Sequence, residues 1–166
     1  MMNATATTVQ AIEPVETSAT GNGTEAGHRS EHRDILRLVH FRNGLFGFPN
    51  HRQFILRSTD HEGLYWLQSA EDDALAFLLA DPFVFVDGYV VELHDAEVEE
   101  LETKAASDIV VLAIVTLPRH AGQPCTLNLQ GPLAIDLRTG RAKQVILADS
   151  EYGLRHPVDL ARRVSA

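Results

Sequence analysis

The sequence predicts a mainly β protein: a small antiparallel β-barrel-like domain with one short helix. Three observations support this fold class. Short apolar runs recur at regular spacing, Gly and Pro residues separate them, and only one segment has the spacing of an amphipathic helix. The 166 residues fit a single domain, and an apolar share of 45% is that of a globular protein.

The N-terminal part differs from the rest in composition. Residues 1–33 are rich in Thr, Ala, Gly, Glu and Ser, and no aromatic residue precedes Phe41. Such a segment buries too little apolar area to offset the entropy of ordering it. We therefore predict a disordered N-terminal tail at residues 1–33, a β-barrel domain at residues 34–160 and a short C-terminal tail at residues 161–166.

The expected strands follow one another from residue 35 onward. Each is a short alternating or continuous apolar run that ends at turn residues, as in antiparallel barrels and sandwiches. Arg138-Thr139-Gly140-Arg141 predicts a hairpin turn in which Gly140 takes a positive φ. The predicted strands are residues 35–41, 54–56, 64–67, 75–79, 89–93, 109–117, 126–129, 133–137 and 144–147.

The expected helix follows the fifth of these runs. Asp95 is placed to cap it, acidic residues fill its first turns, and Lys104 stands near its end, an order that complements the helix dipole. Val98, Leu101 and Ala105 share one face by their spacing. The segment therefore predicts a helix with one apolar stripe and one strongly acidic face.

The net charge of −9 is concentrated in the middle of the chain. Residues 60–108 hold 14 acids and one base, whereas residues 109–166 hold seven bases and four acids. An acidic protein is a poor ligand for nucleic acid, which needs a basic face, but it attracts a basic protein. The simpler interpretation, a solvated acidic surface without a partner, also fits a charge run of this kind.

No motif for catalysis or for a metal or cofactor emerges. Cys125 is the single cysteine, which excludes an internal disulfide and a cysteine-based zinc site. No serine stands in a nucleophile elbow, no glycine-rich loop is followed by Lys-Ser/Thr, and His28 and His32 fall in the predicted tail. We therefore expect no enzyme, no metal and no cofactor.

The sequence also predicts a cytoplasmic protein that neither enters a secretory route nor spans a membrane. The N-terminus lacks the basic and apolar regions of a signal peptide. The long apolar run at Ile109–Leu117 is far shorter than the roughly 20 residues that a spanning helix needs.

Several segments, in order along the chain, resemble the family of the flagellar assembly factor FliW. Phe41–Pro49 (FRNGLFGFP) is similar to the family's F-x-x-G-L-x-G-F opening, and Trp66–Ser69 (WLQS) to its L-Q-S element. Val110–Thr116 matches its central strand, Thr126–Leu133 (TLNLQGPL) its T-x-N-L-x-A-P segment, and Gly140–Leu147 its G-x-x-x-Q strand. The resemblance extends from about residue 35 to residue 157, and its departures are Gly131, where the family more often has Ala, and the long tail.

The resemblance implies a regulator rather than an enzyme. Proteins of this family bind CsrA, a dimeric RNA-binding repressor, and so relieve repression of flagellin mRNA. They also bind newly made flagellin, which couples flagellin synthesis to secretion. The expected partners are thus two proteins, CsrA and flagellin, with no direct contact to nucleic acid. Two other function classes stay open from the residues alone: an unrelated small β-barrel scaffold or chaperone subunit, and an enzyme whose site is assembled from scattered His and acidic residues.

Three groups of residues are candidates for partner binding. The acidic residues are expected to line a surface for CsrA, although a solvated helix face explains them equally well. The aromatic residues near Pro82 and Gly88 are either loop anchors of an interface or core side chains. An Asn is unusual in a strand, so Asn128 either bonds backbone in a bulge or reaches a partner. The candidates are Phe83, Phe85, Tyr89, Glu92, Asp95, Glu97, Glu99, Glu100, Glu102 and Asn128.

Overall fold

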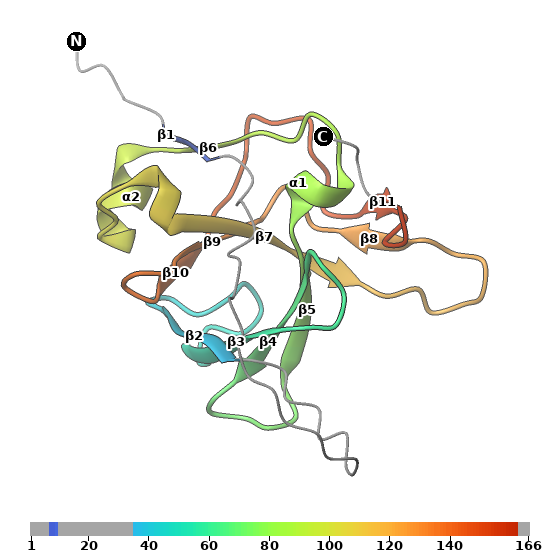
Figure 1. The fold of residues 1–166 in the computed structure, drawn as a ribbon, viewed down its shortest axis with the longest axis horizontal. Helices are drawn as coiled ribbons and strands as arrows, with labels where there is room; N and C mark the ends of the chain where they lie inside the picture. Colours follow the sequence, from blue (N-terminus) through green and yellow to red (C-terminus); the bar gives the residue numbers. More distant parts are fainter. Residues whose placement is uncertain (1–6, 10–34, 163–166) are drawn as a thin grey trace, which may run out of the picture.

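The structure of the protein is a computed structural model, and the residues that it describes are 7–9 and 35–162. Its main sheet is a barrel of seven strands in the order β7-β5-β4-β3-β2-β10-β9, which closes because β9 pairs back with β7 (Figure 1). The mainly β fold class is thereby confirmed. The barrel strands are β2 (Ile35–Phe41), β3 (Gln53–Ser58), β4 (Leu64–Ser69), β5 (Ala76–Ala80), β7 (Ile109–Thr116), β9 (Leu133–Asp136) and β10 (Arg141–Gln144).

Neighbouring barrel strands are antiparallel with one exception. β2 to β5 form a meander, and β9 and β10 form the predicted hairpin, in which Gly140 has a φ of 76°. The exception is β10, which runs parallel to β2 with Arg141 opposite His40. The first and the last strand of the barrel are therefore neighbours, although about a hundred residues separate them in the sequence.

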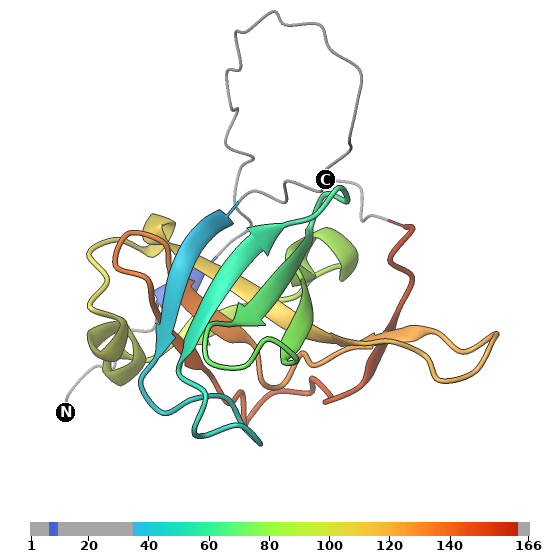
Figure 2. The same cartoon turned by 90° about the horizontal axis from the view of Figure 1, so that it is seen from below.

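The remaining elements form a second layer. On the side of β7 opposite β2–β5 lie β6 and α2, while β8 and β11 continue the sheet from the far half of β7 (Figures 1 and 2). These elements are β1 (Thr7–Val9), α1 (Pro82–Phe85), β6 (Val91–Leu93), α2 (Asp95–Leu101), the 3-10 turn η1 (Ala106–Asp108), β8 (Cys125–Leu127) and β11 (His156–Val158).

Strand β7 separates two hydrophobic cores. Val110 and Leu112 point into the barrel, where they join a cluster that includes Phe41 and Phe54. The alternate residues of β7, such as Val111, belong to a second cluster beneath the outer layer. A strand that is buried on both faces needs apolar residues at every position, which explains the continuous run IVVLAIV.

Several boundaries differ from those that the sequence predicts. His94 is the N-cap of α2 and Asp95 its first residue, and the helix ends at Leu101. The last barrel strand covers residues 141–144 rather than 144–147, because the chain beyond Gln144 bonds to the loop before β9 instead of to a strand. Residues 82–85, expected as a loop, make one helical turn that the Asp81 carboxylate caps by accepting from the N–H of Phe83.

A part of the predicted tail has a place in the fold. Residues 7–9 form β1, which pairs antiparallel with β6, with Thr8 opposite Glu92. Backbone hydrogen bonds hold such a strand, so it needs few apolar side chains. Residues 1–6, 10–34 and 163–166 lie outside the described residues, and the predicted extents of the two tails stay predictions.

Candidate functional site

The predicted aromatic candidates pack against one another in the outer core. Phe85 and Tyr89 are buried, with exposures of 8% and 4%, and the Phe83 ring lies 5.6 Å from that of Tyr89. The Tyr89 hydroxyl donates to the carbonyl of Leu129 at 2.8 Å, and burial raises the pKa of this phenol. These positions favour core packing, the alternative that the sequence left open, over interface anchoring.

Asn128 belongs to a polar cluster that fixes two loops. Its Oδ1 accepts from the N–H of Gly131 at 2.8 Å. The nearby Gln144 side chain, buried at 8% exposure, donates to the Gly131 carbonyl at 3.0 Å and accepts from the N–H of Phe46 at 2.9 Å. The motif residues Asn128 and Gln144 therefore tie the loop at residues 42–49 to the loop before β9. Asn128 bonds backbone, but it does so in the loop after β8, which ends at Leu127, and not in a bulge of the predicted strand 126–129.

Part of the acidic helix face is neutralised by β10. Glu100 accepts from Lys143 Nζ at 2.6 Å, and Glu102 pairs with Arg141 at 2.9 Å. The Glu97 carboxylate accepts from the N–H of His94 at 2.6 Å and so caps the helix. The acidic middle and the basic final third of the sequence thus meet in space, and three of the predicted acids have structural partners.

The other three predicted acids remain available. Glu92, Asp95 and Glu99 are exposed, and within the described ranges none of them has an ion pair. Glu92 projects from β6, while Asp95 and Glu99 lie on α2, which follows β6 directly. The structure therefore leaves an acidic surface across β6 and α2 that is open to a basic partner.

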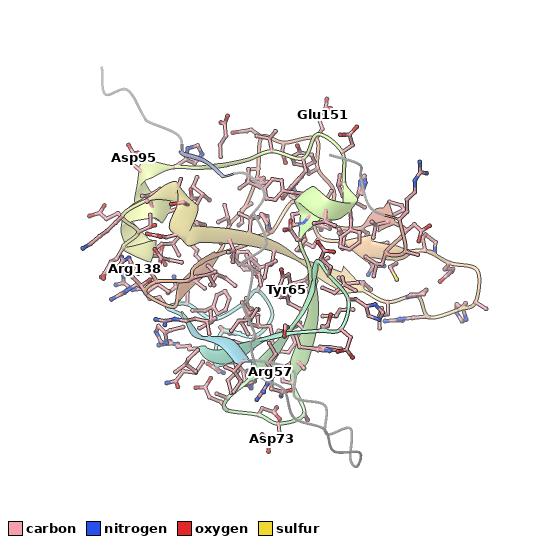
Figure 3. The ribbon with its side chains drawn as sticks, in the orientation of Figure 1. Arg57, Tyr65, Asp73, Asp95, Arg138 and Glu151 are labelled. Carbon is pink, nitrogen blue, oxygen red and sulfur yellow. The ribbon has the colours of Figure 1, made fainter. Side chains whose placement is uncertain are left out.

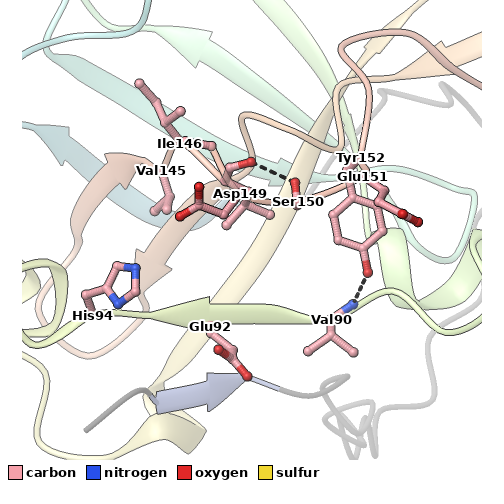
Figure 4. A pocket seen from close by; sticks show the side chains of 11 residues that line it. Val90, Glu92, His94, Val145, Ile146, Asp149, Ser150, Glu151 and Tyr152 are labelled. Carbon is pink, nitrogen blue, oxygen red and sulfur yellow. Dashed lines mark hydrogen bonds between the residues drawn. The ribbon is translucent and has the colours of Figure 1, made fainter. Parts of the chain in front are cut away.

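A groove adjoins this surface. It has a volume of about 550 Å³ and lies between β6 and the chain at residues 145–152 (Figure 4). The hydroxyl of Tyr152 accepts from the N–H of Val90 at 2.9 Å, which joins the two walls at one end. The lining residues are Val90, Glu92, His94, Val145, Ile146, Leu147, Ala148, Asp149, Ser150, Glu151 and Tyr152.

The residues predicted from the sequence include one on the β6 wall of this groove and none on the other wall. Glu92 was predicted, but Ile146, Asp149 and Glu151 were not, because nothing in the sequence places residues 145–152 opposite β6. The available signal was the polar run Asp149-Ser150-Glu151 shortly after the apolar run at residues 145–147. Such a run is common in loops, so it does not by itself identify a site.

The described part of the chain shows no group of three or more His, Cys, Asp or Glu side chains that could hold a metal ion. The earlier pair His28 and His32 lies outside the described residues. The same part of the chain contains no helix long and apolar enough to cross a membrane. The arrangement offers surfaces and a groove for binding.

Comparisons with known proteins agree on one family. A family model described as "FliW protein" matches residues 24–158. The "Flagellar assembly factor FliW" of Treponema denticola is 36% identical over 124 residues, which is 75% of this chain and 82% of the relative. That of Bacillus licheniformis is 38% identical over 123 residues, or 74% of this chain and 85% of the relative.

A solved structure has the same fold. The "Crystal structure of the flagellar assembly factor FliW" superposes with a TM-score of 0.67 at 29% sequence identity. The similarity covers 82% of this chain and 91% of that one. The relatives are named as assembly factors, not as enzymes.

Proposed function

Because the chain belongs to the FliW family of flagellar assembly factors, we propose that it binds the translational repressor CsrA and also flagellin. Binding of CsrA relieves repression of flagellin mRNA. Free flagellin competes with CsrA for the protein. Accumulation of flagellin therefore restores repression of the mRNA, and secretion of flagellin relieves that repression. Synthesis of the filament protein is thereby coupled to its export.

The exposed acids of β6 and α2 support the CsrA part of this proposal. An RNA-binding repressor carries basic surface, and Glu92, Asp95 and Glu99 offer charges of the opposite sign that no described side chain neutralises. Such charges accelerate encounter with a basic protein and repel RNA. We propose that these three residues form part of the CsrA-binding surface, whereas Glu97, Glu100 and Glu102 serve mainly to hold α2 in place.

Titration calorimetry of the full chain with purified CsrA, and separately with purified flagellin, tests the function. Binding of both is expected, and binding of neither would overturn the proposal. The location is tested by the double charge reversal Glu92→Lys/Glu99→Lys, which avoids the acids that cap or pair. The matched control Asp60→Lys/Asp73→Lys changes the charge equally, and Asp73 lies at the opposite end of the molecule from Asp95 (Figure 3).

We expect the reversal on β6 and α2 to weaken CsrA binding about tenfold or more at low salt, with a smaller effect at high salt because ions screen exposed charges. The control pair should leave the affinity for CsrA within about twofold of that of the unaltered chain. If both pairs weaken binding equally, only net charge matters and the proposed location is wrong.

A further inference from the structure

We infer that the groove between β6 and residues 145–152 binds an extended segment of a partner protein in which aliphatic side chains alternate with Lys or Arg. The inference rests on the proposed function in one respect: it takes the partner to be a protein. It goes further by assigning a place on the fold and a ligand chemistry. The volume of the groove, about 550 Å³, lies within the roughly 300–1,000 Å³ of typical ligand sites.

The backbone of both walls favours an extended ligand. Among the described strands β6 pairs only with β1, which occupies one of its two edges, and β6 lies between β1 and the groove (Figure 4). On the other wall, Val145 and Leu147 donate to the carbonyls of Pro132 and Gln130. Extended chain directs alternate N–H groups to opposite sides, so the N–H of Ile146 points away from that loop. An added strand uses backbone groups of this kind.

The pairing of β1 with β6 shows that β6 accepts an added strand. β1 has only three residues, Thr7–Val9, and comes from a part of the chain remote in sequence from β6. It therefore demonstrates, on one edge of β6, the mode of binding that we propose for the edge at the groove.

The side chains of the walls specify aliphatic anchors. Val90 and Ile146 are 48% and 59% exposed, one on each wall of the groove, and the buried Val145, which belongs to the outer core, also lines it. Exposed aliphatic groups that line the same groove lose water when a further apolar side chain packs against them, which favours binding.

The charges of the groove specify the flanking residues of the ligand. Glu92, Asp149 and Glu151 are acidic, and its described lining contains no Lys or Arg. This potential attracts a cationic segment and repels an acidic peptide or an RNA phosphate backbone. Charge and apolar walls together select a basic segment with alternating aliphatic residues.

A short fluorescein-labelled peptide of alternating lysine and valine is the probe, titrated against the full chain by fluorescence anisotropy. Two peptides serve as comparisons: one with glutamate in place of lysine and one with serine in place of valine. The lysine–valine peptide should bind at least about tenfold more tightly than either. Equal binding of the glutamate peptide, or of the serine peptide, would overturn the inference.

Two variants locate the binding. Glu92→Gln/Asp149→Asn removes two charges from the groove and should weaken peptide binding at least about fivefold, while Asp60→Asn/Asp73→Asn removes the same charge elsewhere and should not. Thermal melting verifies that each variant is folded. Hydrogen exchange of the unaltered chain gives an independent readout: the peptide should protect the amides of residues 91–93 and 146–148, and the absence of protection there would refute binding in the groove.

The outcomes separate the two proposals. If the chain binds the peptide in the groove but binds neither CsrA nor flagellin, the inference about the groove stands and the proposed function is wrong. If the chain binds the two proteins but not the peptide, the proposed function stands and the inference about the groove is wrong.

Discussion

The loop at residues 42–49 contains two glycines with positive φ that differ in their surroundings. Gly44 has a φ of 69°, and a Cβ added there would lie 2.5 Å from the carbonyl oxygen of Phe48 and 2.8 Å from Pro49 Cα. Gly47 has a φ of 86°, but an added Cβ would have no atom within 4 Å. Substitution of either residue by Ala strains the backbone, and only at Gly44 does it also create a clash with backbone atoms.

The two substitutions therefore have different expected costs. A left-handed conformation costs an L-residue about 1–2 kcal/mol, which is the expected loss for Gly47→Ala. Gly44→Ala also displaces the loop, which breaks the hydrogen bond from the N–H of Phe46 to the buried Gln144 side chain. An unsatisfied buried polar group costs about 1–3 kcal/mol, so we expect a total loss of about 2–5 kcal/mol.

Urea unfolding followed by the fluorescence of Trp66, the single tryptophan, measures both losses. The effect of Gly→Ala on the unfolded chain is the same at both sites and cancels in the difference between the variants. We expect Gly44→Ala to lower the free energy of unfolding by at least about 1 kcal/mol more than Gly47→Ala. Equal losses would show that the close approach of residues 44 and 48 does not limit the loop, and the reasoning would fail.

Two further predictions concern buried polar groups. Tyr89→Phe leaves the buried carbonyl of Leu129 without its donor and should lower the free energy of unfolding by about 1–3 kcal/mol, whereas Tyr152→Phe should cost less, because its hydroxyl bonds an exposed N–H; urea unfolding that gives the same loss for both would contradict this. For Asp136, burial raises the pKa, but hydrogen bonds from Thr139, from Thr103 and from the N–H of Arg138 outweigh it, so the pKa lies below its ordinary value of 3.8. The ionised group therefore stabilises the fold above about pH 4, and this contribution is lost as the pH falls through the lower folded pKa. Asp136→Asn should make stability less dependent on pH in this acidic range, and an unchanged dependence in urea midpoints measured from pH 5 downward would refute the assignment.

The strands of the barrel were predictable because their apolar pattern is local. β7 is the clearest case, since every position of IVVLAIV contacts one of two cores. The start of α2 was displaced by one residue because His94, a weak capping residue, takes the N-cap position while Glu97 supplies the capping bond. The end of the last barrel strand was misplaced because residues 145–147 are as apolar as a strand but pair with a loop.

The candidate site was only partly predictable, since its determinants are tertiary. The acidity of residues 92–102 is visible in the sequence, but the pairing of Glu100 with Lys143 depends on α2 packing beside β10. The groove depends on a loop about 55 residues after β6 in the sequence. Composition and periodicity describe a segment and its immediate neighbours, so they do not predict which distant segments meet.

The parallel pairing of β2 with β10 has a consequence for how the chain folds. Contacts between Arg141 and His40 are distant in sequence, and closing such a loop costs entropy before any contact compensates for it. On the ribosome, the meander β2–β5 has to wait with an unpaired edge until β10 has been synthesised and has left the exit tunnel. Completion of the barrel therefore follows the synthesis of β10, and until then the nascent chain exposes the β2 edge to other strands.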